Sequence, residues 1–146
     1  MAEKLAGKAA LALAAEGASV AISGRRTDRL EALAKCIMQR GGMAKAFTVD
    51  VSVENQARGM VADTNAAFGQ LDILVSNAGV MLLGPIANAD TEAWRRMVEI
   101  SILGLMYTAH AALPLMRAQG SGRVVTVSSV AGRTARAGAG VYNTSK

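Results

Sequence analysis

The chain has 146 residues, which is enough for one globular domain with a core and too few for two. Hydrophobic residues make up 51% of it and charged residues 18%, a balance that favours a folded over an intrinsically disordered protein. The formal net charge of +5 could indicate a nucleic-acid-binding module. The arginines, however, occur as scattered pairs with no aromatic ladder between them to stack bases, so we expect no nucleic-acid partner.

The first predicted helix is the run Ala9–Gly17, which leads directly into a predicted strand at Ser19–Ser23. The apolar part of this run is short and flanked by acidic residues, so we expect no secretion signal. A second helix is predicted over Asp28–Arg40, with a cap formed by Asp28 and Glu31. Gly41 and Gly42 are expected to end it. Its apolar residues fall on one face and are Leu30, Leu33, Ala34, Ile37 and Met38.

The rest of the chain continues the alternation of strands and helices. Strands are predicted at Ala44–Val49, Leu71–Ser76 and Arg123–Ser128, and helices from Val53 to Phe68, stopping at Gly69, and from Asp90 to about Arg117. The strands are rich in Val, Ile and Leu without polar alternation, as is typical of strands covered on both faces. The pattern predicts an α/β fold, a parallel sheet with helices on both sides, in a single domain over residues 1–146.

Cys36 and His110 are the only residues of their kinds in the chain. A lone cysteine excludes an internal disulfide framework and suits the reducing cytoplasm, where we expect the protein to be. His110 has no evident acid–base partner and is expected to be a packed or interface residue, so no metal site is predicted. The apolar segment Ile100–Met116 carries polar residues and a proline, so we expect no membrane span.

Five strings in the chain carry a family resemblance in their order and spacing. They are GASVAISGRRTDRLEAL, VDVS, LDILVSNAGVMLLGP, GRVVTVSSVAG and YNTSK. Together they resemble the short-chain dehydrogenase/reductase family over Leu5–Lys146. The resemblance implies a Rossmann-like, doubly wound parallel sheet. It also implies an enzyme that moves a hydride between nicotinamide and the carbon of a small carbonyl or alcohol substrate.

Tyr142 and Lys146 match the catalytic Y-x-x-x-K motif of the family. They stand four residues apart, so they share one face of a helix. The resemblance implies that Tyr142 donates and accepts the proton, while the Lys146 ammonium group favours the phenolate and holds the nicotinamide ribose. Ser129, thirteen residues before Tyr142, matches the serine that hydrogen-bonds the substrate oxygen. Its neighbour Ser128 is the alternative, and without the motif both serines would be ordinary turn residues.

The residues at the end of the Ser19–Ser23 strand predict the choice of cofactor. Gly24 stands where an acidic residue would bind the ribose of NAD. Arg25 and Arg26 follow it, and guanidinium groups there would accept a 2′-phosphate, so NADP(H) is preferred over NAD(H). The alternative is a pair of solvated arginines at a turn.

Two further segments match cofactor contacts of the family. Asp50 and Val51 match the pair that contacts adenine, although Asp50 is alternatively a helix-entry residue. The turn Asn77–Ala78–Gly79 matches the N-A-G turn, where a small residue lets the cofactor approach closely.

The chain departs from the family pattern at four places. No strand and no G-x-x-x-G-x-G loop precede the first helix, so the sheet is expected to be incomplete and two of its strands to lack their shared neighbour. The expected C-terminal part is also missing after Lys146, which predicts a frayed last helix. Ser101 replaces the catalytic asparagine, and Ser76 replaces the first asparagine of N-N-A-G.

The sequence therefore favours an NADP(H)-dependent oxidoreductase of short-chain type that acts on a small-molecule carbonyl or alcohol. A catalytically inactive remnant or truncated product, associated with a full-length relative, is the alternative. Many members of the family dimerise through the helix that corresponds to residues 90–117, so a homo-oligomer formed through it is possible.

Overall fold

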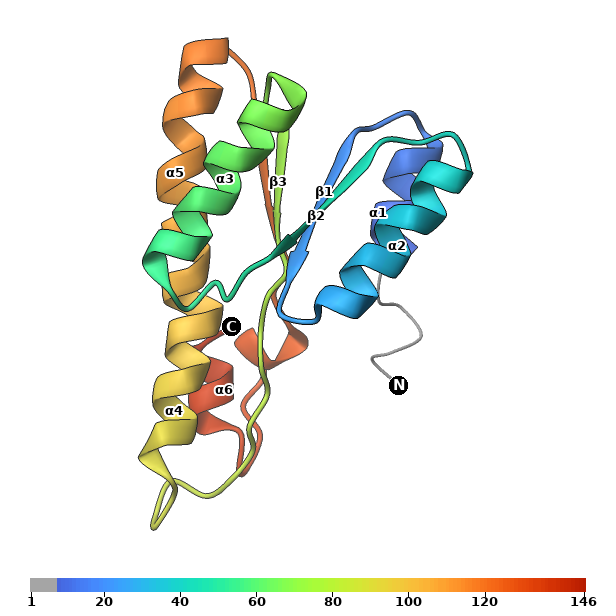
Figure 1. The fold of residues 1–146 in the computed structure, drawn as a ribbon. Coiled ribbons are helices and arrows are strands. Elements are labelled where there is room, and N and C mark those ends of the chain that lie inside the picture. Colours follow the sequence, from blue (N-terminus) through green and yellow to red (C-terminus); the bar gives the residue numbers. More distant parts are fainter. Residues whose placement is uncertain (1–7) are drawn as a thin grey trace. The chain divides into compact units, whose positions relative to one another are not determined.

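The computed structural model describes residues 8–146, in which helices and strands alternate along the chain (Figure 1). The N-terminal region, where a first strand was expected to be absent, lies mostly outside the described residues. Residue contacts divide the chain into two units, Met1–Asp50 and Val51–Lys146, and each is described by itself.

The first unit contains two helices and a pair of parallel strands. Its elements are α1 (Lys8–Ala15), β1 (Val20–Gly24), α2 (Thr27–Gln39) and β2 (Ala44–Thr48). The register of the strand pair runs from Val20 opposite Ala44 to Gly24 opposite Thr48. Every strand and helix predicted for this unit is therefore present, with boundaries shifted by a few residues.

Helix α2 packs through a narrower face than its sequence predicted. Leu30, Ala34 and Ile37 are buried, but Met38 is 53% exposed. At about 100° per residue, Met38 lies at the margin of the apolar face that Leu30 and Ile37 centre.

The ends of α2 differ in how well they were predicted. The cap pair of Asp28 with Glu31 is wrong, because Arg26 is the residue before the helix and no side chain caps it. Asp28 lies in the first turn, where its charge still favours the helix dipole. The predicted glycine stop is confirmed, since Gly41 has a φ of 81° and its N–H donates to the Met38 carbonyl at 3.0 Å.

The second unit contains a long helix, a covering helix and a second pair of parallel strands. Its elements are α3 (Glu54–Phe68), β3 (Ile73–Ser76), α4 (Thr91–Val98), a π-helical turn (Glu99–Leu103), α5 (Gly104–Gln119), β4 (Arg123–Thr126), a 3₁₀ turn (Val130–Gly132) and α6 (Gly140–Thr144). The strand register runs from Ile73 opposite Arg123 to Ser76 opposite Thr126. Helix α3 lies alongside α5 in Figure 1.

The predicted start of the long helix at Asp90 and the predicted stop of α3 at Gly69 are confirmed, whereas α5 runs two residues beyond the predicted Arg117. The Asp90 carboxylate caps α4 by accepting from the Glu92 N–H at 3.0 Å. Gly69 and Gly120 end α3 and α5 in the left-handed conformation, with φ of 81° and 76°. The helix from α4 to α5 is continuous through the π-helical turn.

The core of the second unit lies between α3, α5 and one face of its sheet. It is formed by Val61, Leu71, Leu74, Ala112 and Met116. The other face of the sheet is uncovered within this unit, because Ile73, Val75, Val125 and Val127 are each 46–47% exposed. The expectation that these strands are covered on both faces is therefore not met by the residues of this unit alone.

The described strands form two separate two-stranded sheets, β1–β2 and β3–β4. Each of β1 and β3 therefore has a strand neighbour on one side only, within residues 8–146. The same is true of β2 and β4, so this pairing does not test the expectation that two strands lack their shared neighbour.

Length and composition alone do not exclude a membrane span, contrary to the sequence-based expectation. The continuous helix Thr91–Gln119, with 29 residues, is long enough and apolar enough to cross a membrane. One such helix is weak evidence, because core helices of soluble proteins meet the same criteria. Here a buried residue recurs every three or four positions, as in a core helix. These residues are Met97, Ile100, Gly104, Thr108, Ala112 and Met116.

Candidate active site

Three predicted site residues that are far apart in sequence converge at Gly79. A Cβ atom on Gly79 would lie 2.7 Å from Lys146 Nζ and 3.6 Å from Ser101 Oγ. Gly79 ends the turn Asn77–Gly79 that follows β3, Ser101 lies in the π-helical turn, and Lys146 follows α6. The absence of a side chain at Gly79 is thus what gives the lysine ammonium group its place.

Tyr142 and Lys146 lie together, as their spacing predicts. The Lys146 Nζ is 5.9 Å from the centre of the Tyr142 ring. Helix α6 has only five residues, and a helix of that length is not stable alone. The frayed end stays a prediction, although Ser145 at the end of this helix is 7% exposed and donates from its Oγ to the Tyr142 carbonyl at 2.8 Å.

The hydrogen bonds of the two neighbouring serines separate their roles. The Ser128 hydroxyl donates its proton to the Lys146 carbonyl oxygen at 2.7 Å. The Ser129 Oγ instead accepts from the Ala131 N–H at 3.2 Å, so its own proton is free to be donated. Of the two hydroxyls, only that of Ser129 therefore has a proton left to donate.

Ser101 is buried and its hydroxyl has no hydrogen-bond partner in the described part of the chain. It lies in the π-helical turn, a feature that is frequent at functional sites. The helix beyond it approaches the chain after β2 closely, because a Cβ on Gly104 would be 2.9 Å from Val51 Cγ2. Val51 therefore packs on the start of α5, a contact that the sequence did not indicate.

The predicted phosphate-binding residues lie in the first unit. Gly24 is the last residue of β1, and the Arg25 side chain beyond it is 54% exposed. Its Nη1 is 3.9 Å from Asp50 Oδ2, so the cofactor residues predicted for this unit lie side by side. Arg26 is exposed at the start of α2. The structure thus brings together one group of predicted residues in each unit.

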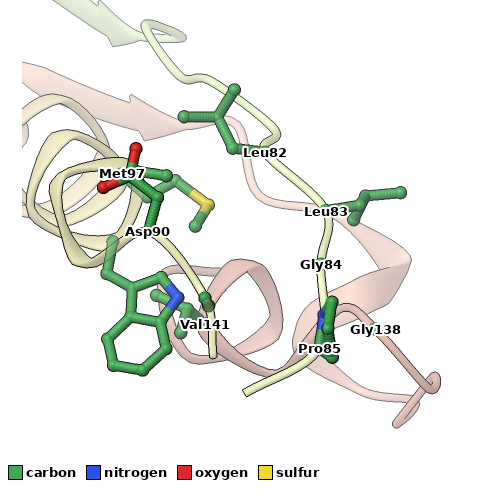
Figure 2. A pocket seen from close by; sticks show the side chains of 11 residues that line it. Leu82, Leu83, Gly84, Pro85, Asp90, Met97, Gly138 and Val141 are labelled. Carbon is green, nitrogen blue, oxygen red and sulfur yellow. The ribbon is translucent and has the colours of Figure 1, made fainter. Parts of the chain in front are cut away.

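A pocket of about 210 Å³ lies beside the residue that precedes Tyr142. Figure 2 shows Leu82, Leu83 and Pro85 on one side of it and Met97 and Val141 on the other. Apolar side chains predominate in the wall, and its one carboxylate, that of Asp90, accepts the capping hydrogen bond of α4. This pocket suits the apolar part of a small substrate.

The surroundings fit a nicotinamide nucleotide in two places. In the second unit, an ammonium group and an unpartnered buried hydroxyl flank a residue without a side chain, which suits hydrogen bonding to a ribose. In the first unit, Gly24 is followed by two arginines that suit a phosphate.

Comparison with known proteins assigns the chain to a family. The profile of the short chain dehydrogenase family matches residues 4–146. The chain therefore belongs to the short-chain dehydrogenase/reductase family, whose members are oxidoreductases that use nicotinamide cofactors and act on small molecules.

Individual relatives agree with this assignment. An uncharacterized oxidoreductase of Staphylococcus saprophyticus is 36% identical over 92% of the chain and 58% of its own length. A metagenomic short-chain oxidoreductase solved with NADP matches with a TM-score of 0.92 and 28% identity, over 97% of the chain and 65% of that protein. An NAD⁺-bound xylitol dehydrogenase matches equally well, with a TM-score of 0.92 and 28% identity, over 97% of the chain and 55% of that protein. The chain thus spans between half and two thirds of their lengths.

Adding a methyl group at Gly79 tests the convergence on this residue. The Gly79→Ala variant is expected to fold normally, because Lys146 Nζ is the end of a flexible side chain and can move away from the new Cβ. Cofactor affinity and turnover should each fall about tenfold, since the ammonium group loses its place. Melting temperature, NADPH titration and turnover would be measured together. The matched control is Gly59→Ala, whose Cβ would meet nothing within 4 Å. Equal behaviour of the two variants would contradict the prediction.

Proposed function

We propose that the protein is an NADP(H)-dependent oxidoreductase that interconverts a small carbonyl compound and the corresponding alcohol. The observation that carries this proposal is the convergence of Lys146 Nζ and Ser101 Oγ on Gly79, with the Tyr142 ring 5.9 Å from the same ammonium group. When bound, the nicotinamide supplies or takes up the hydride. The residues of the chain bind, orient and manage the proton.

Each predicted residue has a role in this proposal. Tyr142 donates its hydroxyl proton to the substrate oxygen as a carbonyl is reduced, and takes it back in the reverse direction. Lys146 favours the resulting phenolate by its positive charge and holds the ribose. Ser129 donates a hydrogen bond to the same substrate oxygen, using the proton that its contact with Ala131 leaves free.

The remaining residues hold the nucleotide. Arg25 and Arg26 bind the 2′-phosphate, which makes NADP(H) the preferred cofactor. Asp50 and Val51 contact the adenine, and Asn77, Ala78 and Gly79 form the turn along which the nucleotide lies. The pocket beside Val141 takes the apolar part of a small substrate. We place this activity in the cytoplasm, and the exposed Met106 and Leu113 of α5 would serve a homo-oligomer.

The second candidate function is that of an inactive partner of a full-length relative. It is favoured by the one-sided pairing of β1 and β3 and by serine in place of asparagine at position 101. Such a protein would retain the fold of each unit and bind no cofactor.

Titration with NADPH separates the two candidates. An NADP(H)-dependent enzyme should be stabilised by about 2.7 kcal/mol at a hundredfold excess over the dissociation constant. Nucleotide fluorescence and melting temperature would be followed against NADPH, with NADH as the comparison. If neither fluorescence nor melting temperature responds to either nucleotide, the oxidoreductase proposal fails and the inactive partner is favoured.

Restoring the asparagine of the family tests the role of position 101. Ser101 has one short hydroxyl, whereas asparagine has a longer amide that both donates and accepts. The Ser101→Asn variant is expected to raise kcat about tenfold, because the amide reaches further toward the proton path beside Lys146. Steady-state rates would be compared with those of Ser101→Ala, which should not gain. A folded Ser101→Asn variant with unchanged or lower kcat would overturn this role.

A further inference from the structure

Ser129 lies in one segment of the chain, and Tyr142 and Lys146 lie in another. The chain that connects the two segments does not fix their relative position. The chain between them, residues 133–138, is exposed, and α6 is too short to be stable alone. Ala139 and Ser145 are the buried residues in the stretch from 133 to 146. The relative position of the three proposed catalytic side chains therefore depends on contacts between the two segments.

Two side-chain hydrogen bonds join these segments. The Ser128 Oγ donates to the Lys146 carbonyl oxygen at 2.7 Å, beside Gly132, whose Cβ would lie 2.6 Å from that oxygen. The Asn143 Nδ2 donates to the Thr134 carbonyl oxygen at 3.0 Å. We refer to these two bonds as the clasp. One bond starts on the residue before Ser129, and the other starts on the residue after Tyr142.

The Thr134 end of the clasp is rigidly connected to Ser129. The Thr134 N–H and hydroxyl both donate to the Val130 carbonyl, at 3.1 and 3.0 Å. Val130 begins the 3₁₀ turn that Ser129 caps. A displacement of Thr134 would thus be transmitted to the Ser129 hydroxyl through one short turn.

The Asn143 amide makes its bond to Thr134 while its own oxygen lacks a partner. Its Oδ1 is buried and has no hydrogen-bond partner in the described residues. A buried acceptor without a partner is unfavourable, and an apolar residue at this position would avoid it. The amide therefore contributes through its one donated bond to Thr134.

We propose that Asn143 and Ser128 are positioning residues, which hold the Ser129 hydroxyl in register with Tyr142 and Lys146 through the clasp. The inference rests on the oxidoreductase function proposed above. Neither side chain needs to touch the substrate, because each acts through a backbone carbonyl of the opposite segment.

The test compares Asn143→Ala, Ser128→Ala and Ser128→Thr with the matched control Thr144→Ala. Thr144 is exposed on the same helix, and its hydroxyl bonds only to Gly140 within that helix, at 3.0 Å. Each alanine variant of the clasp should lower kcat at least tenfold with KM and NADPH affinity within twofold of wild type. Ser128→Thr, which keeps the hydroxyl, should restore kcat, and Thr144→Ala should behave as wild type.

Hydrogen exchange of the unliganded protein gives a readout that needs no activity. Breaking either bond of the clasp should raise the exchange of amides in both 129–134 and 140–146, with exchange in α3 and α5 unchanged. If wild type reduces no substrate, the proposed function fails, whereas the clasp is still decided by exchange. Clasp variants that match Thr144→Ala in exchange, or in kcat where wild type is active, would overturn the proposal.

Discussion

Replacing Tyr142 by phenylalanine is expected to lower kcat/KM by a factor of about 10²–10⁴, the range that a positioned general acid contributes. The variant loses only the hydroxyl, and its ring can still lie beside Lys146 Nζ as in the wild type. NADPH affinity and melting temperature should therefore change little. Steady-state kinetics with a panel of small aldehydes and ketones, together with NADPH titration, would measure all three quantities.

The chain offers a matched control for this experiment. Its only other tyrosine, Tyr107, lies in α5, so Tyr107→Phe removes a hydroxyl outside the proposed site. Full activity in Tyr142→Phe, or an equal loss in both variants, would exclude Tyr142 as the proton donor.

Removing both arginines that follow β1 is expected to abolish the preference for NADP(H). Hydrogen bonds to a charged phosphate contribute about 1.5–3 kcal/mol each, so the Arg25→Ala, Arg26→Ala double variant should bind NADPH about 10²-fold more weakly. NADH affinity should stay the same, because NADH lacks the 2′-phosphate. Titrating both nucleotides at constant ionic strength would measure the ratio of their dissociation constants.

The control for the arginine pair is Arg40→Ala, which removes an exposed arginine at the other end of α2. It alters the net charge of the first unit without touching the end of β1. If the double variant loses NADPH and NADH affinity equally, the arginines do not recognise the 2′-phosphate.

The elements of the fold were predictable because local signals agree with the tertiary contacts. Runs with Val or Ile became β1, β3 and β4, and glycines with positive φ ended α2, α3 and α5. The errors concern which side chains are buried, because burial depends on neighbouring elements and not on the local sequence alone. Met38 sits at the margin of its helical face, and the exposed side of β3 depends on what covers the sheet.

The residues of the candidate site could be predicted from sequence motifs, but the contacts between them could not. The sequence pointed to Gly79, Ser101 and Lys146 separately, yet no pattern indicated that the side-chain-free space of Gly79 holds the lysine. The contacts of the last segment were missed for the same reason. The length of a helix reflects only its local hydrogen bonds, whereas the Asn143–Thr134 and Ser128–Lys146 bonds join residues nine and eighteen positions apart.

The one-sided pairing of β1 and β3 within residues 8–146 has a consequence for handling the protein. A strand with one free edge presents unpaired N–H and C=O groups that can template another chain. On β3 this edge adjoins a half-exposed apolar surface formed by Ile73 and Val75. We therefore expect self-association that grows with protein concentration, and light scattering across a dilution series would reveal it before any assay of turnover.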